Sequence, residues 1–349
     1  MEKILFINQE QFGYHIDTFY YTRYLKSKYE VTYLGFETRE AKINLEGTRI
    51  KYISFKGKLL IRYLRFLIQS LGEILNESYD LIFIKYFPGC SLFAIINRRI
   101  ILDIRTATIS DNFSKIILDY LIRIEVKFFK NITIISESLA KRLKLKRYNI
   151  LPIGGEQFST ITKDFNSINI IYVGTLTRRN IADTVTGIKL FLEENESNIE
   201  IKYRIIGTGF KHEEEELVSL VKSYRLENII EVLGYIPQSE LKRYFDISNI
   251  GLSYIPITDY YNYQPPTKTF EYLLSGMVCI ATDTFENRRI INDTNGILIK
   301  ANPKELKDAL KLFLRKRDSY QSEQIRATAK MYSWENIINN HLIPLLRSV

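Results

Sequence analysis

Three cationic side chains suited to binding a diphosphate, and one carboxylate, lie in two segments of the second half of this 349-residue chain. Arg178 and Arg179 follow the apolar run "INIIYVG", and Lys268 and Glu271 follow a double proline. Guanidinium groups match phosphate oxygens through paired hydrogen bonds, and a lysine adds a compact charge. We therefore expect the arginines and Lys268 to bind a diphosphate. The alternative for Arg178 and Arg179 is a pair of solvated loop charges.

Lys268 and Glu271 stand three residues apart in "PPTKTFEYLLSG", where the pattern predicts a helix over residues 267–275. The start of a helix at Thr267 presents free N–H groups and about half a positive charge, which attract an anion. Lys268 would lie in the first turn and Glu271 one turn deeper. The alternative is an exposed ion pair worth about 0.2–0.5 kcal/mol.

Glycines follow two further predicted strands of the second half. Gly207 and Gly209 end "RIIGTG", and Gly234 precedes Tyr235 and Ile236 in "VLGYI". Each pattern by itself also describes an ordinary turn.

These motifs need a fold that brings strand ends together. Short β-branched runs alternate with helix-like runs, beginning at Lys3–Asn8 and beginning again at Ile168–Gly174. Between them, Ile150–Ser167 carries a proline, a Gly-Gly pair and scattered polar residues, and is predicted to be a linker. The alternation predicts an α/β protein with two Rossmann-like, doubly wound parallel sheets facing across a cleft. Ligands of such sheets bind at the carboxyl ends of the strands.

The excess positive charge lies in the first half. Residues 1–150 hold 25 Lys and Arg against 15 Asp and Glu, whereas the whole chain has a net charge of +9. Such a field attracts an anionic membrane surface or a phosphorylated substrate, unless the composition is simply uneven. The chain carries no nucleic-acid-binding signature, so we expect no nucleic acid partner. Two cysteines predict a reducing, cytoplasmic location, and no uncharged stretch exceeds 13 residues, well short of the roughly 20 that span a bilayer.

One basic segment, residues 56–75, is rich in leucine and isoleucine. Lys58, Arg62, Arg65 and Gln69 fall along one helical stripe, and apolar residues cover most of the remainder. This pattern favours either a helix in a membrane interface or a core helix with a narrow wet edge.

The order of the motifs is more specific than any one of them. "YVGTL", "IIGTG", "VLGYIPQSEL", "PPTKTFEYLLSGMVCIATD" and "IINDTNGILI" follow one another between residues 150 and 345. This order resembles the donor domain of family 4 glycosyltransferases (glycosyl transferases group 1), which have the GT-B fold. The resemblance implies an acceptor-binding domain over residues 1–155, a nucleotide-sugar-binding domain over 168–333, and a final helix, about 334–349, that packs back on the first domain.

The resemblance also assigns roles within the donor helix. The family has two glutamates eight positions apart, of which the second contacts the ribose hydroxyls, and Glu271 matches this second position. Counting back eight residues gives Tyr263 in place of the glutamate that contacts the donor sugar. The departure leaves open how the sugar hydroxyls are held.

The family's phosphate-binding arginine and lysine are replaced in this chain. Thr175 stands where the family has the arginine, and a residue near Ile181 stands where it has the lysine. Arg178 and Arg179 are close enough in sequence to substitute for them. Thr267, Tyr235 and Ile236, with the glycines Gly174, Gly207 and Gly209, complete the expected donor site.

In the first half, Gly13 matches a family glycine near the donor phosphate. His15, beside it, and Asp103 and Arg105, at the end of "IILDIRT", are the candidate catalytic groups. The family's histidine after a later strand has no counterpart in that loop. A retaining transfer does not require a side-chain base, because a donor phosphate oxygen can take the acceptor proton.

The resemblance implies a retaining glycosyltransferase, an enzyme of the hexosyltransferase class (EC 2.4). It would transfer sugar from a nucleotide-diphosphate sugar to a glycan, lipid-linked, in bacterial capsule, O-antigen or exopolysaccharide synthesis. We expect no cofactor and no metal, and a cytoplasmic or peripheral membrane location. The alternatives are a GT-B nucleotide-sugar epimerase and a non-catalytic nucleotide-sugar-binding or scaffold protein.

Overall fold

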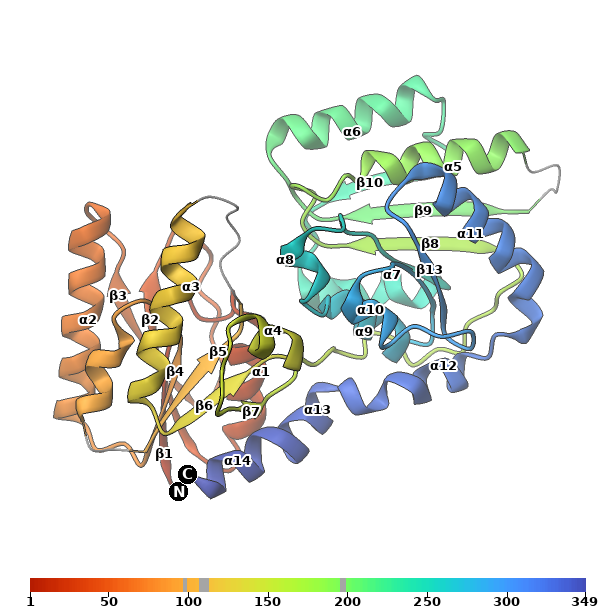
Figure 1. Ribbon diagram of the computed structural model, residues 1–349. Helices are drawn as coiled ribbons and strands as arrows, with labels where there is room; N and C mark the ends of the chain where they lie inside the picture. The colour runs from red at the N-terminus through yellow and green to blue at the C-terminus, as the bar shows by residue number, and fades with distance from the viewer. Residues whose placement is uncertain (97–98, 107–112, 195–198) are drawn as a thin grey trace. The chain divides into compact units, whose positions relative to one another are not determined.

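The computed structural model of the chain describes residues 1–96, 99–106, 113–194 and 199–349. The chain divides into two compact units. Unit 1 comprises Met1–Ile153 with Trp334–Val349, and unit 2 comprises Gly154–Ser333. Each unit is built around one parallel sheet (Figure 1).

Unit 1 contains a seven-stranded sheet in the order β3-β2-β1-β4-β5-β6-β7. The central strands are buried on both faces and are correspondingly rich in Ile, Leu and Phe, as parallel strands are. The strands are β1 (Lys3–Ile7), β2 (Glu30–Glu37), β3 (Thr48–Ser54), β4 (Leu81–Lys85), β5 (Ile100–Ile104), β6 (Asn131–Ile134) and β7 (Asn149–Ile150).

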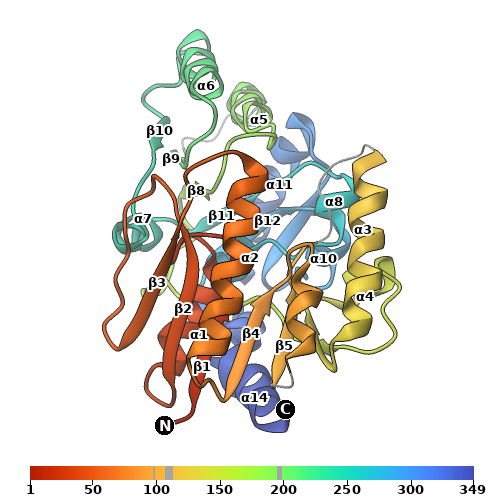
Figure 2. The ribbon, with the colours of Figure 1, turned by 90° about the vertical axis from the view of Figure 1, so that its left-hand side faces the viewer.

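Helices connect these strands by crossovers on both faces of the sheet. Figure 2 shows α2 and α3 over one face, with α1 behind. The helical segments are α1 (Ile16–Leu25), α2 (Leu59–Asn76), η1 (Cys90–Ile95), α3 (Phe113–Glu125), η2 (Val126–Phe128) and α4 (Glu137–Arg142).

The end of the chain returns to unit 1. It forms α13 (Trp334–Ile337), a π-helical segment η6 (Ile338–Leu342) and α14 (Ile343–Ser348). The Trp334 ring stacks on Tyr20 of α1 with 4.8 Å between ring centres, and Arg99 donates to the Leu346 carbonyl at 2.9 Å.

Unit 2 contains a six-stranded sheet in the order β10-β9-β8-β11-β12-β13. The order reverses between β8 and β11, which is the position where doubly wound sheets bind ligands. The strands are β8 (Ile168–Val173), β9 (Ile201–Ile206), β10 (Ile230–Gly234), β11 (Ile250–Ser253), β12 (Val278–Thr282) and β13 (Gly296–Ile299).

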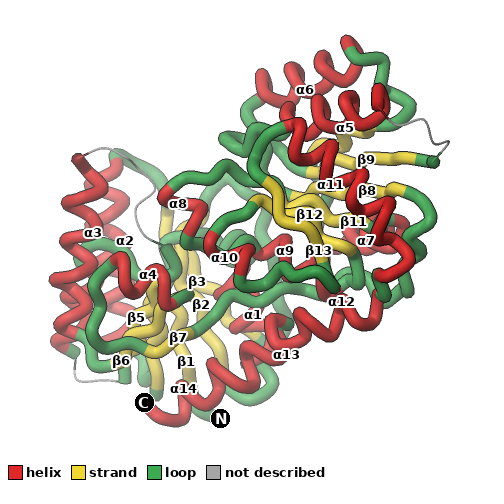
Figure 3. Tube along the Cα trace, turned by 45° about the vertical axis from the view of Figure 1, so that its right-hand side comes forward, coloured by secondary structure: helices red, strands yellow, loops and turns green. Residues whose placement is uncertain are grey.

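Helices flank both faces of this sheet as well (Figure 3). They are α5 (Ala182–Glu194), α6 (Lys211–Ser223), η3 (Gln238–Glu240), α7 (Leu241–Ile247), α8 (Asp259–Asn262), α9 (Thr267–Leu274), α10 (Phe285–Arg288), α11 (Pro303–Lys316), η4 (Arg317–Ser319), α12 (Ser322–Ala329) and η5 (Lys330–Tyr332).

The two predicted doubly wound parallel sheets are confirmed. Sequence patterns did not predict α8, whose four residues are too short to show a helical period. Across the described residues, every helix is too short or too polar to cross a lipid bilayer.

Candidate functional site in unit 2

Three glycines form a side-chain-free edge where β8, β9 and β10 end. Gly174 donates its N–H to the Ile206 carbonyl at 2.9 Å, and Gly207 donates to the Gly234 carbonyl at 2.8 Å. Gly174 and Gly207 have φ of +147° and +142°, which side chains rarely allow. A Cβ atom on Gly207 would overlap the Gly174 carbonyl. The carboxyl edge of the sheet therefore presents bare backbone at these positions.

Lys268 lies directly above this edge. Its Nζ is 4.0 Å from the centre of the Tyr172 ring, and a Cβ atom on Gly174 would lie 2.8 Å from Nζ. Burial, together with the positive charge of Arg179, lowers the pKa of Lys268 to about 7, although Glu271 acts in the opposite direction. An anion bound at Nζ would offset both the burial of the ammonium and its repulsion by Arg179.

Arg179 supplies the second cation. Its guanidinium carbon is 4.1 Å from the centre of the Tyr261 ring. Nε and Nη1 are buried, and neither finds a hydrogen-bond acceptor within the described part of the chain. Because a buried N–H without an acceptor costs about 1–3 kcal/mol, these two donors favour binding of an acceptor from outside the protein.

Glu271 lies one turn beyond Lys268 and is 8% exposed. Burial, followed by the neighbouring carboxylate of Glu156, raises the pKa of Glu271 to about 8, and Lys268 partly offsets this. Among the residues described, no salt bridge joins Lys268 to Glu271, and Glu271 is buried, so the exposed ion pair considered above does not form. A carboxylate in this place can accept two hydrogen bonds from a vicinal diol.

Helix α9, which carries both residues, is fixed to the sheet by its other side. The Tyr272 hydroxyl accepts from the Val173 N–H at 2.9 Å, and its ring packs against Gly251, where a Cβ atom would overlap it. The Thr269 hydroxyl lies 2.8 Å from the Ser253 hydroxyl and 3.0 Å from Asn287 Oδ1. The helix start, with Thr267 as its first residue, is therefore held in place at the carboxyl edge of the sheet.

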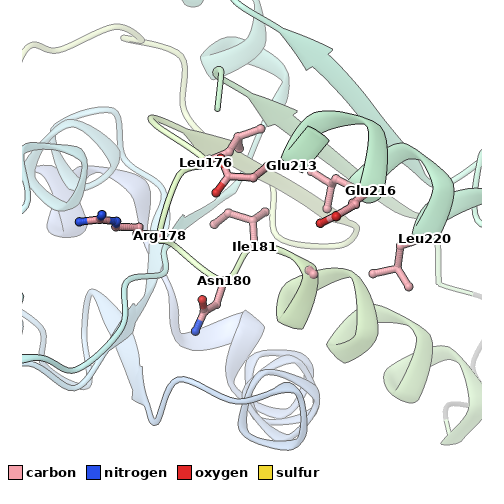
Figure 4. A pocket seen from close by; sticks show the side chains of 9 residues that line it. Leu176, Arg178, Asn180, Ile181, Glu213, Glu216 and Leu220 are labelled. Atoms are coloured by element: carbon pink, nitrogen blue, oxygen red, sulfur yellow. The ribbon is translucent and has the colours of Figure 1, made fainter. Parts of the chain in front are cut away.

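The structure places Arg178 apart from Arg179. The loop contains two residues in left-handed conformation, Arg178 (φ +57°) and Asn180 (φ +54°). Arg178 is exposed, and it is Arg179 whose charge acts on Lys268. Figure 4 shows the Arg178 side chain extending away from Glu213 and from the other residues that line a neighbouring pocket of about 400 Å³.

Gly209 lies against Glu213, one of the residues that line this pocket. Its N–H donates to Glu214 Oε1 at 2.9 Å, and a Cβ atom on it would lie 2.6 Å from Glu213 Oε2. The lack of a side chain on Gly209 therefore leaves room for Glu213 and Glu214 in the first turn of α6.

The remaining predicted donor-site residues lie around this arrangement. Tyr235 is exposed and Ile236 is half-buried, both directly after β10, and Thr175 is exposed after β8. Tyr263, in the position where the family has a glutamate, lies with its ring centre 5.7 Å from that of Phe285. The residue that the resemblance aligns with the family's first glutamate therefore belongs to an aromatic pair.

The candidate catalytic groups Asp103 and Arg105 of unit 1 belong to a buried network. Arg105 Nε is 2.5 Å from Asp17 Oδ2, and its Nη1 donates to the Leu151 carbonyl at 2.6 Å. Asp103 accepts from the Thr133 hydroxyl at 2.7 Å and is fully buried. The network ties α1 to β5, β6 and the segment after β7, and both side chains are buried.

His15 caps the start of α1. Its Nδ1 accepts from the Thr18 N–H at 3.4 Å. Burial lowers the pKa of His15 to about 4, despite the opposing charge of Asp17, so the imidazole is neutral near pH 7. Gly13, in the same loop, has φ of +91°, and a Cβ atom there would overlap Ile43.

Three residues of the unit 2 site were not identified from the sequence: Tyr172, Tyr261 and Glu156. Two tyrosine rings carry the cations, and a carboxylate faces Glu271. Of these three, only Tyr172 could have been identified from the sequence. It stands two residues before Gly174 on a strand, and alternation places its side chain on the same face of the strand as the Gly174 position.

Comparisons with known proteins identify the family and the fold. A family model described as "Glycosyl transferases group 1" matches residues 155–331, just over half of the chain. A search against curated protein sequences gives no match.

Solved structures show the same fold over the whole chain. Sucrose-phosphate synthase from Thermosynechococcus elongatus has a TM-score of 0.78 at 15% identity, and 100% of this chain and 99% of that one are covered. Alr3699/HepE from Anabaena, in complex with UDP, has a TM-score of 0.73 at 13% identity, with 99% and 100% covered. The lipopolysaccharide outer core galactosyltransferase WaaB, in its apo form, has a TM-score of 0.69 at 14% identity, with 99% and 100% covered.

The family match covers the segment that carries the glycine edge, Arg179, Lys268 and Glu271, and both sheets match GT-B structures. The chain is a GT-B protein and belongs to the glycosyl transferases group 1 family.

Proposed function

We propose that the protein is a retaining glycosyltransferase that uses a nucleotide-diphosphate sugar and transfers the sugar to a glycan acceptor carried on a lipid. The observation that supports this most directly is the pair of cations Arg179 and Lys268. They lie over an edge of bare backbone, and the two buried N–H groups of Arg179 have no acceptor among the described residues. A diphosphate supplies the charge and the oxygen atoms that these groups need.

Glu271 gives the orientation of the nucleotide in this proposal. Its carboxylate would accept hydrogen bonds from the ribose hydroxyls, while Lys268 and the start of α9 contact the diphosphate. One of the similar structures contains UDP, and another contains UDP-glucose, which is consistent with a nucleotide sugar as the donor.

In the reaction, the bond between the anomeric carbon and the diphosphate oxygen breaks, and the nucleoside diphosphate leaves with the electron pair. The acceptor hydroxyl forms the new glycosidic bond on the same face of the sugar, and its proton passes to an oxygen of the leaving diphosphate. Arg179 and Lys268 would stabilise the charge that develops on this leaving group, which is where fixed charges contribute most to the rate. We propose that no metal ion is required, because these two cations neutralise the diphosphate.

A thermal-shift screen against UDP-, GDP-, dTDP- and ADP-sugars tests the donor. A ligand present at 100 times its Kd should stabilise the folded protein by about 2.7 kcal/mol. If no nucleotide sugar raises the melting temperature, the donor assignment is wrong. Incubation with the donor alone then separates transfer from epimerisation, because an epimerase converts the sugar nucleotide without an acceptor.

Transfer itself is measured with lipid-linked glycan acceptors from bacterial membranes, in buffer with and without EDTA. The proposal predicts transfer in both buffers and a product whose anomeric configuration, read by NMR, equals that of the donor. Nucleotide binding without transfer to any glycan, together with unchanged glycan assembly in cells that carry Lys268→Gln, would instead support a non-catalytic binding protein. The pathway (capsule, O-antigen or exopolysaccharide) follows from the acceptor that is used.

A further inference from the structure

We propose that one face of unit 1, formed by the outer sides of α2, η1, α3 and η2, docks onto an anionic lipid bilayer. This proposal does not depend on the donor site, and its test requires neither donor nor acceptor. It rests on where the apolar side chains of α2 point, on the neighbouring elements that continue the same surface, and on the charge around it.

Helix α2 turns an apolar stripe toward solvent. Leu60, Leu64, Ile68, Leu71 and Leu75 recur at spacings of four, four, three and four residues, so they lie on one side of the helix. All five are exposed, Leu60 and Ile68 by 68% each and Leu75 by 61%. Such a stripe normally faces the core, but here the core receives a different set of side chains.

The side of α2 that packs against the protein carries Phe66, Ser70 and Ile74, which are buried. The Phe66 ring lies 4.8 Å from Phe36 and 5.2 Å from Phe87, measured between ring centres. The helix is therefore already anchored to its sheet, and the opposite stripe is left without a partner in the described part of unit 1.

The arginines of α2 do not form the exposed side. The Arg62 guanidinium carbon lies 4.0 Å from the centre of the Phe55 ring, and Arg65 Nη1 donates to the carbonyls of Ser54 and Lys56 at 2.9 and 2.8 Å. Both arginine side chains therefore pack on the loop before the helix and not on its solvent-facing side. The outer edge of α2 is apolar and exposed along the length of the helix, so it is not the narrow wet edge of a core helix.

Neighbouring elements continue the apolar surface. The turn before η1 packs against α2, because a Cβ atom on Gly89 would lie 2.6 Å from the Tyr63 hydroxyl. Glu125 at the end of α3 accepts from the Gly89 N–H at 2.6 Å, which joins α3 to the same turn. α2 and α3 lie over one face of the sheet in Figure 2. These neighbours expose five further large apolar side chains: Leu92, Ile95, Ile117, Tyr120 and Phe128.

The charge around this surface is positive. Lys56 and Lys58 before α2 are exposed, as are Lys127 and Lys130 at and after η2. Of the acidic side chains described in these four elements, Glu73 is paired with Lys51 at 2.7 Å, and Asp119 and Glu125 are buried. An anionic bilayer offers both an apolar interior for the stripe and negative head groups for the lysines.

The charge also argues against a second copy of the chain as the partner. Two copies meeting through this face would bring the lysines of both together, whereas the nearby carboxylates of Glu73 and Glu77 already lie within 4 Å of Lys51. A bilayer that contains anionic lipid does not have this difficulty, and an apolar patch of this extent is rarely left in water.

Vesicle flotation tests the proposal on the full chain. The protein should float with vesicles rich in phosphatidylglycerol and much less with pure phosphatidylcholine. The double variant Leu64→Glu/Ile68→Glu should lower the bound fraction by at least roughly tenfold, because it places two charges in the apolar stripe. Lys56→Gln/Lys58→Gln should lower binding to the anionic vesicles by roughly tenfold and should weaken its dependence on salt.

Ile247→Glu/Ile257→Glu is the matched control, since both isoleucines are about half exposed but lie in unit 2. This variant should bind vesicles as the unchanged protein does. Thermal melting and far-UV circular dichroism verify that each variant is folded. The proposal is wrong if the unchanged protein does not float, if the Leu64/Ile68 variant floats equally well, or if that variant only converts a dimer to a monomer in sedimentation velocity.

Discussion

The ammonium of Lys268 lies 4.0 Å from the centre of the Tyr172 ring, although the two residues come from different elements of unit 2. The ring face partly compensates the buried charge without neutralising it, since a cation on an aromatic face gains about 0.5–2 kcal/mol. Arg179 is held in the same way on Tyr261. Both cations are therefore fixed in position, and both keep N–H groups for a ligand.

Replacing Lys268 with Gln should weaken binding of the nucleoside diphosphate selected by the thermal-shift screen. The loss should be about 1.5–3 kcal/mol, or roughly ten- to a hundredfold in Kd, because a hydrogen bond between two charged groups is removed. Binding of the corresponding nucleoside, which has no phosphate, should change by less than about twofold. Isothermal titration calorimetry with both ligands measures the difference.

Arg178→Gln and Arg179→Gln form a matched pair of controls for this experiment. The structure places only Arg179 beside Lys268, so Arg179→Gln should weaken diphosphate binding and Arg178→Gln should leave it nearly unchanged. The opposite order of effects would show that the phosphate site lies on the other side of the loop.

The buried carboxyl of Glu271 should make the stability of the ligand-free protein depend on pH. Its pKa is raised from 4.5 to about 8 by burial and by Glu156, so the folded state binds a proton that the unfolded state has lost between these values. Relative to Glu271→Gln, the free energy of unfolding should therefore fall as pH rises from about 4.5 to 8, by at most about 1.4 kcal/mol per pH unit. Urea unfolding of both proteins at several pH values measures this slope.

Glu156→Gln provides the control for the pH dependence. Removing this carboxylate should lower the pKa of Glu271 and end the fall in stability at a lower pH. A slope that is the same in the unchanged protein and in Glu271→Gln would show that Glu271 ionises normally.

The glycine at the end of β9 should tolerate no side chain. Gly207→Ala should destabilise unit 2 by about 2–4 kcal/mol, because φ is +142° and the new Cβ atom would overlap the Gly174 carbonyl. Gly72→Ala in α2 is the comparison, since no atom lies within 4 Å of its Cβ position. That change should stabilise the protein by about 0.5–1 kcal/mol. Denaturant unfolding measures both, and a neutral Gly207→Ala would contradict the geometry of the edge.

The sequence allowed prediction of the parts of the site that depend on short-range order. The spacing of Lys268 and Glu271 on one helix, and the glycines at the ends of β8 and β9, follow from patterns within a few residues. The separation of Arg178 from Arg179 does not, because the left-handed conformation of Arg178 is unfavourable for an arginine and is imposed by the folded loop.

In unit 1, sequence patterns could not predict contacts between residues that lie far apart in the chain. Asp103 and Arg105 end a strand, where functional residues often occur, but Asp17 lies 88 residues before Arg105 and only the folded sheet brings them together. Likewise, helix α2 was expected from its sequence, but the contacts of its arginines were not. Arg65 donates to the carbonyls of Ser54 and Lys56 in the loop before the helix, and a helical period does not reveal such backbone partners.

The last prediction concerns this buried network. Arg105→Met should destabilise unit 1 by about 3–5 kcal/mol, because it leaves the carboxylates of Asp17 and Asp103 buried without their cation. Arg49→Met is the comparison: Arg49 is half exposed and 3.8 Å from Glu30, so its loss should cost less than about 1 kcal/mol. Urea unfolding measures both, and nucleotide affinity of the folded Arg105→Met protein should stay unchanged, because the donor site belongs to unit 2. A stable but inactive Arg105→Met protein would instead restore Arg105 as a candidate catalytic group.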